Sequence, residues 1–500
     1  MKRFTSLALM LAVMFCFSVS CSGDGHADVT SPPADTSEDS SEEVTEVTTY
    51  RHVEDNLPKD LDLGGTKVTF WAEERYGVDL FAEELRSEPI NDSVYNRELF
   101  VEERLNVMIE RLKSNASFLD EVLKQSNSGD KIYDVFGHVS DQIADYVFDG
   151  YYLDLADVDY LDFDMPWWNT DFINECSIKG KIFMITGSLS LTMLRSVFAV
   201  YFNKTTADNY SGKIEELGDL YGLVDRGEWT IDRLMQLGGD IYEDLNGDQI
   251  RDEEDAYGIT LYDEAADIPY GAFDISIFEK DEDDWFVFNV NIEKLIDAYE
   301  KIYKLFYDTP GCGRNAIYGD TSTGSVSADT MFASGNALFF IGMLKNVENS
   351  KFRNMSDDYG ILPEPKYNEA QKEYLAHPNK ITSFAISYIN DDPGPAAAVL
   401  EAMASYSYNE TVPAYLDLAL KGRYMSDPQS RKMIDLTVAN IRVEAAWTYL
   451  EEIAAGYAPV FRYRVWEGRT DFASTHQTYV AKIKRALMGY LDKFEKNFPD

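Results

Sequence analysis

The chain has 500 residues and carries 88 acidic against 45 basic side chains, a formal net charge of −43. Its length exceeds what one hydrophobic core usually organises, so we expect two lobes or domains, for which 45% hydrophobic and 13% aromatic residues are ample material. A surface this acidic repels phosphate backbones and anionic membrane surfaces, which argues against nucleic acid as a partner.

The N-terminus has the pattern of an export signal. Two basic residues precede an apolar stretch over about residues 7–19, which is too short to span a bilayer. The segment SVSC over 18–21 is similar to a bacterial lipobox, although Ser18 stands where leucine is usual. We therefore predict a signal peptide over 1–20 and a lipid on Cys21, which would anchor the protein in the cell membrane at its extracytoplasmic face. The alternative is an ordinary cleaved signal with an incidental cysteine.

The segment that follows Cys21 consists mainly of Ser, Thr, Asp, Glu and Pro, with hardly an apolar cluster. Such a composition cannot bury enough surface to offset the entropy lost on ordering. We therefore predict that residues 21–58 form a disordered acidic tether between the lipid and the fold.

The first lobe is expected to contain a strand over 67–71 and another over 132–137, each followed by a polar exit loop. In open α/β sheets, ligands lie at the carboxyl ends of parallel strands. The two exit loops are therefore the candidate ligand loops of this lobe. Their candidate residues are Trp71, Glu74, Tyr76, His138, Ser140 and Asp141.

The stretch Lys181–Lys204 predicts two buried strands. Its second part, over 197–202, is a nearly continuous run of β-branched and aromatic residues. A run that is apolar on both faces enters the middle of a sheet, and the polar region after it indicates that the chain leaves on the far side. Such a crossover is typical of two-lobed proteins.

The second lobe is expected to hold a helix beginning after Thr230, a strand over 258–262 and an amphipathic helix over 291–306. Tyr262 and Asp263 lie at the carboxyl end of that strand, in the same position as the exit loops of the first lobe. Both are therefore candidate ligand residues.

Three tryptophans are candidate platforms for a ligand, because an aromatic face stacks on the apolar face of a sugar ring. Trp168 precedes the crossover, Trp285 lies in an acidic run, and Trp466 lies in the segment RYRVWEGR. The alternative for the pair Trp167-Trp168 is a core or hinge position, which we prefer for Trp167.

Two later apolar segments predict further strands, and the second of them is expected to be a further crossing between lobes. They are the helix-glycine-strand pattern FASGNALFFIG over 332–342 and the run ITSFAISYI over 381–389. Beyond Pro393 the chain has a helical pattern to its end. The predicted lobes are discontinuous: 59–196 with 345–384, and 197–344 with 385–500.

An acidic loop in the second lobe has the spacing of a calcium site. An EF-hand-type loop supplies oxygen ligands at positions 1, 3, 5, 7, 9 and 12. Here these positions hold Asp244, Asn246, Asp248, the carbonyl of Ile250, Asp252 and Asp255. Position six, which is usually glycine, holds Gln249, so the turn there would be strained or differently made. We predict a structural Ca²⁺; the alternative is a solvated acidic loop.

Motifs of catalysis do not stand out in the sequence. Two cysteines, Cys176 and Cys312, remain in the mature chain, and they are either paired or two semi-buried thiols. There is no GxSxG, P-loop or HExxH pattern, and acidic pairs such as Glu73-Glu74 are expected by chance in so acidic a chain. We therefore expect a protein that is not an enzyme.

Six segments, spread from about residue 67 to the end, resemble one family. They are INDSVY (90–95), VEERLNV (101–107), PWW (166–168), FNK (202–204), FASGNALFF (332–340) and DYGILPEPKY (358–367). With these segments the chain resembles the extracellular solute-binding proteins of family 1, the maltose-binding-type receptors of ABC importers.

The resemblance implies an α/β fold of the two-lobed periplasmic-binding-protein type, with a hinge, an inter-lobe cleft and a helical C-terminal part. It further implies a monomer that closes on a sugar or oligosaccharide and delivers it to the permease subunits of an ABC transporter. A peptide or another small polar solute is the alternative ligand. The polar loop His138–Asp141 resembles the family's ligand loop in position, and DYGILPEPKY would add a strand to the first lobe. The alternative function is a surface lipoprotein that captures or hydrolyses polysaccharide, which would need two carboxyl groups facing each other across the cleft.

Overall fold

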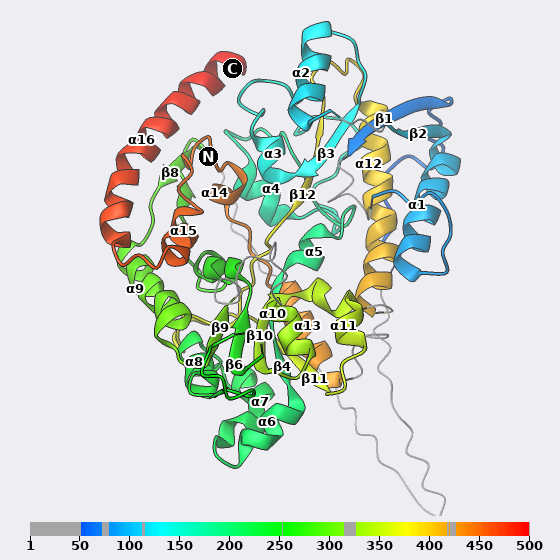
Figure 1. Ribbon diagram of the computed structural model, residues 1–500. Coiled ribbons are helices and arrows are strands. Elements are labelled where there is room, and N and C mark those ends of the chain that lie inside the picture. Colours follow the sequence, from blue (N-terminus) through cyan, green and yellow to red (C-terminus); the bar gives the residue numbers. More distant parts are fainter. Residues whose placement is uncertain are drawn as a thin grey trace, which may run out of the picture. The chain divides into compact units, whose positions relative to one another are not determined.

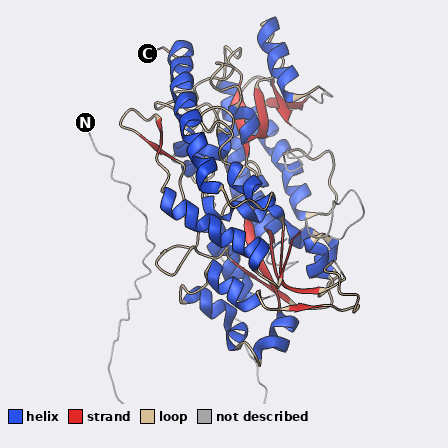
Figure 2. Ribbon diagram, turned by 60° about the vertical axis from the view of Figure 1, so that its left-hand side comes forward, coloured by secondary structure: helices blue, strands red, loops and turns tan. Residues whose placement is uncertain are grey.

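The computed structural model describes most of the chain beyond residue 51. The described residues are 52–72, 80–112, 116–252, 254–314, 327–417, 420 and 427–499. They belong to one compact unit, Arg51–Asp500, that contains two main sheets with helices around them (Figures 1 and 2). The predicted signal peptide, Cys21 and most of the predicted tether lie outside the described residues.

The first sheet has four strands in the order β12-β3-β1-β2. The strands are β1 (Thr66–Ala72), β2 (Val107–Arg111), β3 (Val135–Val139) and β12 (Thr382–Ile386). β1 pairs in parallel with β2 and β3, whereas β12 is antiparallel to β3. The carboxyl ends of β1 and β3 therefore lie at the same edge, as predicted for their exit loops.

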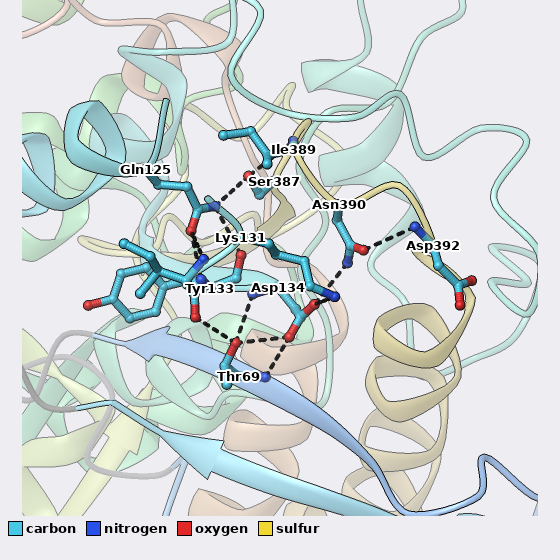
Figure 3. Close-up of polar contacts among 10 residues, drawn as sticks. Thr69, Gln125, Lys131, Tyr133, Asp134, Ser387, Ile389, Asn390 and Asp392 are labelled. Carbon is cyan, nitrogen blue, oxygen red and sulfur yellow. Dashed lines mark hydrogen bonds and ion pairs between the residues drawn. The ribbon is translucent and has the colours of Figure 1, made fainter. Parts of the chain in front are cut away.

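Two buried side chains tie this sheet to the chain that follows β12 (Figure 3). A carboxylate oxygen of Asp134 accepts hydrogen bonds from the backbone N–H and hydroxyl of Thr69 at 2.8 and 2.9 Å, and the other oxygen accepts from the Asn390 amide at 3.1 Å. The amide of Gln125 donates to the Ser387 hydroxyl at 2.6 Å. These contacts fix the position of β12, which comes from far along the chain.

The second sheet has the order β11-β4-β10-β6-β5, and β9 also pairs with β6. Its strands are β4 (Phe198–Asn203), β5 (Tyr242–Glu243), β6 (Ala256–Leu261), β9 (Cys312–Arg314), β10 (Ala337–Met343) and β11 (Tyr359–Leu362). Every residue of β4 and β10 is buried, which agrees with their continuous apolar sequences. A separate hairpin is formed by β7 (Phe278–Lys280) and β8 (Phe286–Phe288).

The strand within DYGILPEPKY is β11, and it differs from the expectation drawn from the family pattern. It pairs antiparallel with β4 at the edge of the second sheet, with Ile361 opposite Tyr201. The next strand, β12, joins the first sheet. The chain therefore returns to the first sheet after β11 and not before it. Where the two lobes divide along the chain stays a prediction.

Helices cover both sheets. In the first half of the chain they are α1 (Pro89–Leu105), α2 (Phe118–Ser128), α3 (Ser140–Ala144), α4 (Thr170–Cys176), α5 (Thr192–Ser196), α6 (Lys204–Ser211), α7 (Leu220–Asp225) and α8 (Ile231–Gly238). In the second half they are α9 (Ile292–Tyr303), α10 (Ala328–Ala333), α11 (Ser350–Arg353), α12 (Gly394–Tyr406), α13 (Pro428–Ala439), α14 (Ala445–Thr448), α15 (Val460–Trp466) and α16 (Phe472–Asn497). Helix α12 packs beside α1 and on β1, while α13 packs on β11 (Figure 1).

The helix starts predicted in the second lobe are confirmed. The Thr230 hydroxyl accepts from the backbone N–H of Arg233 at 3.2 Å, which caps α8. The Asn291 side chain accepts from Lys294 N–H at 3.1 Å and caps α9, which ends at Tyr303 and continues as a π-helical turn, Lys304–Asp308. Cys176 and Cys312 are both buried, and they are not joined by a disulfide. Among the described helices, none has the length and apolarity needed to span a membrane.

Candidate functional site

A pocket of about 260 Å³ is lined by segments that adjoin strands of both sheets. The first-sheet side supplies Ser140 and Asp141, directly after β3, and residues 377–381, which lead into β12. The second-sheet side supplies residues from the 3₁₀ segment Asp263–Tyr270, which follows β6. Residues of the α14 and α15 region close the pocket, and α14 lies beside α3 (Figure 1).

The C-terminal wall is aromatic and carries two guanidinium groups, those of Arg442 and Arg462. Trp447 of α14 is half-buried, and Tyr463 of α15 is 47% exposed. The guanidinium of Arg462 lies 5.3 Å from the Trp447 ring and 5.1 Å from the Trp466 ring. Stacking on both rings limits the conformations of this cation and leaves aromatic surface along the wall.

Residues on all sides of the pocket have buried polar atoms without hydrogen-bond partners. Asp267, Tyr270 and Glu444 are 3%, 1% and 6% exposed, and each has one such side-chain oxygen. Nε of Arg462 and Nε2 of His377 also lack a partner. A buried polar group without a partner costs about 1–3 kcal/mol. Five such atoms belong to residues that line one pocket, which distinguishes it as a polar site.

The pocket is lined by ionisable groups of both signs, and burial favours the neutral form of two of its carboxyl groups. Burial raises the pKa of Asp267 to about 6, although Arg462 lies 2.6 Å from its carboxylate. Burial and the nearby Glu175 raise the pKa of Glu444 to about 7. Burial disfavours the charged form of His377, but the Glu364 carboxylate outweighs that effect and raises the pKa of the imidazole. The pocket is therefore suited to an uncharged ligand that both donates and accepts hydrogen bonds.

Two other pockets, of about 350 and 410 Å³, are larger but differ in character. One is lined by the segment after residue 51 together with α1, and the other by the N-terminal part of α4 and residues 439–443. Among their described lining residues, none has a buried polar atom that lacks a hydrogen-bond partner. We therefore take the pocket beside Trp447, called the Trp447 pocket below, as the candidate site.

Two of the residues predicted from the first sheet line the Trp447 pocket. They are Ser140, whose backbone N–H donates to the Ile381 carbonyl at 2.8 Å, and Asp141, whose carboxylate lies 3.8 Å from Nζ of Lys380. Their position follows from the topology, because β3 ends at Val139 and the chain turns into α3 at that edge.

His138 and Trp71 lie at the same edge but are not among the residues that line the pocket. Their rings stack at a centroid distance of 5.5 Å, and Phe118 packs against both. Burial, followed by the charge of Lys380, lowers the pKa of His138 to about 4. Glu74 and Tyr76 lie outside the described residues.

The structure places the other predicted aromatics away from the pocket surface. Trp168 is buried, and its indole N–H donates to Glu401 at 2.8 Å. Trp285 is buried against Phe286 and Phe494. Both side chains are packed against other parts of the protein, so in this conformation neither ring faces the candidate site.

The last three candidates, Tyr262, Asp263 and Trp466, are not among the residues that line the pocket. The Tyr262 hydroxyl accepts from the Asn346 amide at 2.7 Å, and its ring packs on Phe340. The carbonyl of Asp263 accepts from the indole N–H of Trp466 at 2.9 Å. The Trp466 ring packs against the guanidinium of Arg462, whereas Arg462 and Tyr463 line the pocket.

Most residues of the pocket were not predicted from the sequence. The segment RYRVWEGR over 462–469 was recognised, but the pocket residues are at its start and Trp466 is one helical turn further on. Asp267, Tyr270, Glu444 and Trp447 lie in short segments with no motif around them. The available signal was the aromatic and basic content of the C-terminal helical part.

The comparisons with known proteins concern the fold. No family model and no curated protein matches the chain. It is similar to the galacto-N-biose/lacto-N-biose I-binding protein of an ABC transporter from Bifidobacterium longum, solved with lacto-N-biose, at 11% identity and a TM-score of 0.54 over 85% of this chain and 98% of that one. A sugar transporter from Rhizobium etli in an open conformation gives 14% identity and a TM-score of 0.53 over 86% and 99%.

A cyclo/maltodextrin-binding protein complexed with maltotetraose gives 13% identity and a TM-score of 0.51, over 87% of this chain and 98% of that one. Each of these proteins is covered almost completely. The predicted α/β fold of the two-lobed periplasmic-binding-protein type is thereby confirmed.

Proposed function

We propose that the protein is the solute-binding receptor of an ABC importer and captures a sugar or oligosaccharide in the Trp447 pocket. The observation that carries the proposal is the combination of aromatic surface with five buried polar atoms that lack partners. A sugar hydroxyl donates to a carboxylate and accepts from a guanidinium, while its C–H faces lie on aromatic rings. The three similar structures described above, two sugar-binding proteins and a sugar transporter, support the same class of ligand.

The proposed cycle needs no bond to be broken. Ser140 and Asp141 belong to the first-sheet side of the pocket, and Asp267 and Tyr270 belong to the second-sheet side. A ligand held by both sides would favour the closed arrangement, which the permease subunits would then recognise. We propose that the protein acts as a monomer in this cycle.

A polysaccharide hydrolase is the second candidate, because Asp267 and Glu444 both line the pocket with raised pKa values. Each carboxyl is, however, already engaged within the protein: Asp267 pairs with Arg462, and Glu444 accepts from the Ser276 hydroxyl at 3.1 Å. This engagement favours binding over catalysis. Recovery of an oligosaccharide unchanged after prolonged incubation with the protein supports the receptor, whereas shortened products support the hydrolase.

The first test is a thermal-shift screen of the mature protein against neutral mono- and oligosaccharides, since a ligand that binds only the folded state raises Tm. For a sugar found in this way, Trp447→Ala should raise Kd by about 5- to 150-fold, equivalent to about 1–3 kcal/mol of lost burial. Calorimetry measures the change. Tyr388→Ala removes an equally aromatic but 42% exposed side chain outside the pocket and serves as the control. Unchanged affinity in Trp447→Ala would place the ligand elsewhere.

We further propose that a lipid on Cys21 anchors the receptor at the extracytoplasmic face of the cell membrane. The support is the small-residue pattern before Cys21 and the acidic segment after it. Cys21→Ser should release the protein from the membrane fraction into the soluble extracytoplasmic fraction. Immunoblots of separated fractions measure this, and a variant that still sediments with membranes would contradict the lipid assignment.

A further inference from the structure

The acidic loop between β5 and β6 is folded around its own side chains. The two carboxylate oxygens of Asp244 accept backbone hydrogen bonds from Gly247 at 2.6 Å and Gln249 at 2.9 Å. Asn246 accepts from Asp248 N–H at 2.9 Å, and Asp248 accepts from Ile250 N–H at 2.7 Å. The side chains at loop positions one, three and five thus each hold a turn of the loop backbone.

The turn at position six forms without the usual glycine. Gln249 has φ of 63° and Gly247 has φ of 78°, so both residues adopt the left-handed conformation. A non-glycine residue in this region carries a small conformational cost, which the backbone hydrogen bond to Asp244 offsets. The departure of Gln249 from the glycine of calcium loops therefore does not prevent the turn.

An independent observation comes from Asp255, the last residue of the loop. Asp255 is fully buried, and its Oδ1 has no hydrogen-bond partner. Its Oδ2 accepts from the Tyr242 hydroxyl at 2.8 Å and from the backbone N–H of Asp252 at 3.3 Å. Because one oxygen bonds the loop backbone, the carboxyl group faces the loop. A buried carboxylate oxygen without a partner is costly unless a cation or a donor reaches it.

The negative charge of the loop is also uncompensated. Among the described residues, no ion pair involves the aspartates at 244, 248, 252 or 255. Arg251 is the nearest basic residue in sequence, but its guanidinium stacks on the Tyr242 ring at 4.2 Å and donates to the Pro310 carbonyl. Four carboxylates within twelve residues therefore have no ion-pair partner among the described residues.

We propose that this loop binds one Ca²⁺. The ligands are the oxygens of Asp244, Asn246, Asp248, the Ile250 carbonyl, Asp252 and Asp255, a set of hard donors that suits this cation. The described residues contain no ready-made cluster of three acidic, histidine or cysteine side chains around one point, so binding includes inward rotation of the aspartates. Oδ1 of Asp255 is the oxygen that is already buried without a partner.

Binding of the cation would stabilise the second sheet. The loop joins β5 to β6, which are paired antiparallel, and β6 lies between β5 and β10. At its other end β6 leads through Tyr262 into the 3₁₀ segment that carries Asp267 and Tyr270. A fixed loop therefore holds the start of a strand whose end supports the pocket, although the calcium site itself is independent of which ligand the pocket takes.

The test uses the mature protein after removal of metal with a chelator. Addition of CaCl₂ should raise Tm by several degrees, and calorimetry should report one site. MgCl₂ at the same concentration is the control for ionic screening, because a chain of net charge −43 gains stability from any divalent salt. A chelator added back should lower Tm to its starting value.

Asp248→Ala should remove the calcium response, because it deletes the proposed ligand at loop position five. Since Asp248 is exposed, its loss should leave the fold intact. Asp208→Ala, which removes an exposed carboxylate on α6, should respond as the unmodified protein does. Asp255→Asn should weaken calcium affinity by roughly tenfold or more. Equal shifts with CaCl₂ and MgCl₂, or a full calcium response in Asp248→Ala, would overturn the proposal.

Discussion

Replacing Glu401 by alanine is expected to destabilise the protein by about 3–5 kcal/mol. The two carboxylate oxygens of Glu401 accept the indole N–H groups of Trp167 at 3.0 Å and Trp168 at 2.8 Å. All three side chains are buried. Alanine leaves two buried donors without an acceptor, at about 1–3 kcal/mol each, and opens a cavity between α12 and the segment 167–168. Urea denaturation followed by circular dichroism measures the loss.

Two further variants separate the hydrogen bonds from the volume. Glu401→Gln keeps the shape and one acceptor oxygen, so it should lose clearly less stability than Glu401→Ala. Glu410→Ala removes an exposed carboxylate just beyond α12 and should stay within about 0.5 kcal/mol of the unmodified protein. If Glu401→Ala unfolds at the same urea concentration as Glu410→Ala, the indole contacts contribute nothing to stability.

The fold could be predicted because its two sheets depend on local patterns. The apolar runs at Phe198–Asn203 and Ala337–Met343 became fully buried strands of the second sheet, as their lack of alternation predicts. The exit loop after β3 followed from the parallel topology of the first sheet, and it placed Ser140 and Asp141 in the candidate site. The buried strands need only the local apolar pattern, whereas the exit loop also needs the parallel pairing of β1 with β3.

The rest of the site could not be predicted, because its residues converge from distant segments without a fixed spacing. Trp447 and Arg462 meet through the packing of two short helices, and Asp267 reaches Arg462 across 195 residues of chain. Trp168, by contrast, was predicted as a ligand residue but is buried. A tryptophan beside a crossover suits a ligand platform or a buried position equally well, and the partner that decides between them, Glu401, lies 233 residues away.

The pair Asp267–Arg462 gives the second large expected effect. Arg462→Met keeps much of the apolar stem that packs on the aromatic wall but removes the cation that lies 2.6 Å from the Asp267 carboxylate. An acidic side chain that is 3% exposed then stands without its partner. At pH 8 we expect a loss of about 3–5 kcal/mol in the free energy of unfolding, together with loss of sugar binding.

The same variant should show a distinctive pH dependence. The pKa of Asp267 is already raised by burial to about 6, and removal of Arg462 raises it further. Between the pKa of the unfolded chain and that raised value, the folded state holds the proton more tightly, so stability falls as pH rises. The deficit of Arg462→Met relative to the unmodified protein should therefore be smaller at pH 5 than at pH 8.

Asp267→Asn removes the titrating group, and in combination with Arg462→Met it should abolish the difference between the two pH values. An equal deficit at pH 5 and pH 8 would show that the buried Asp267 charge is not the source of the loss.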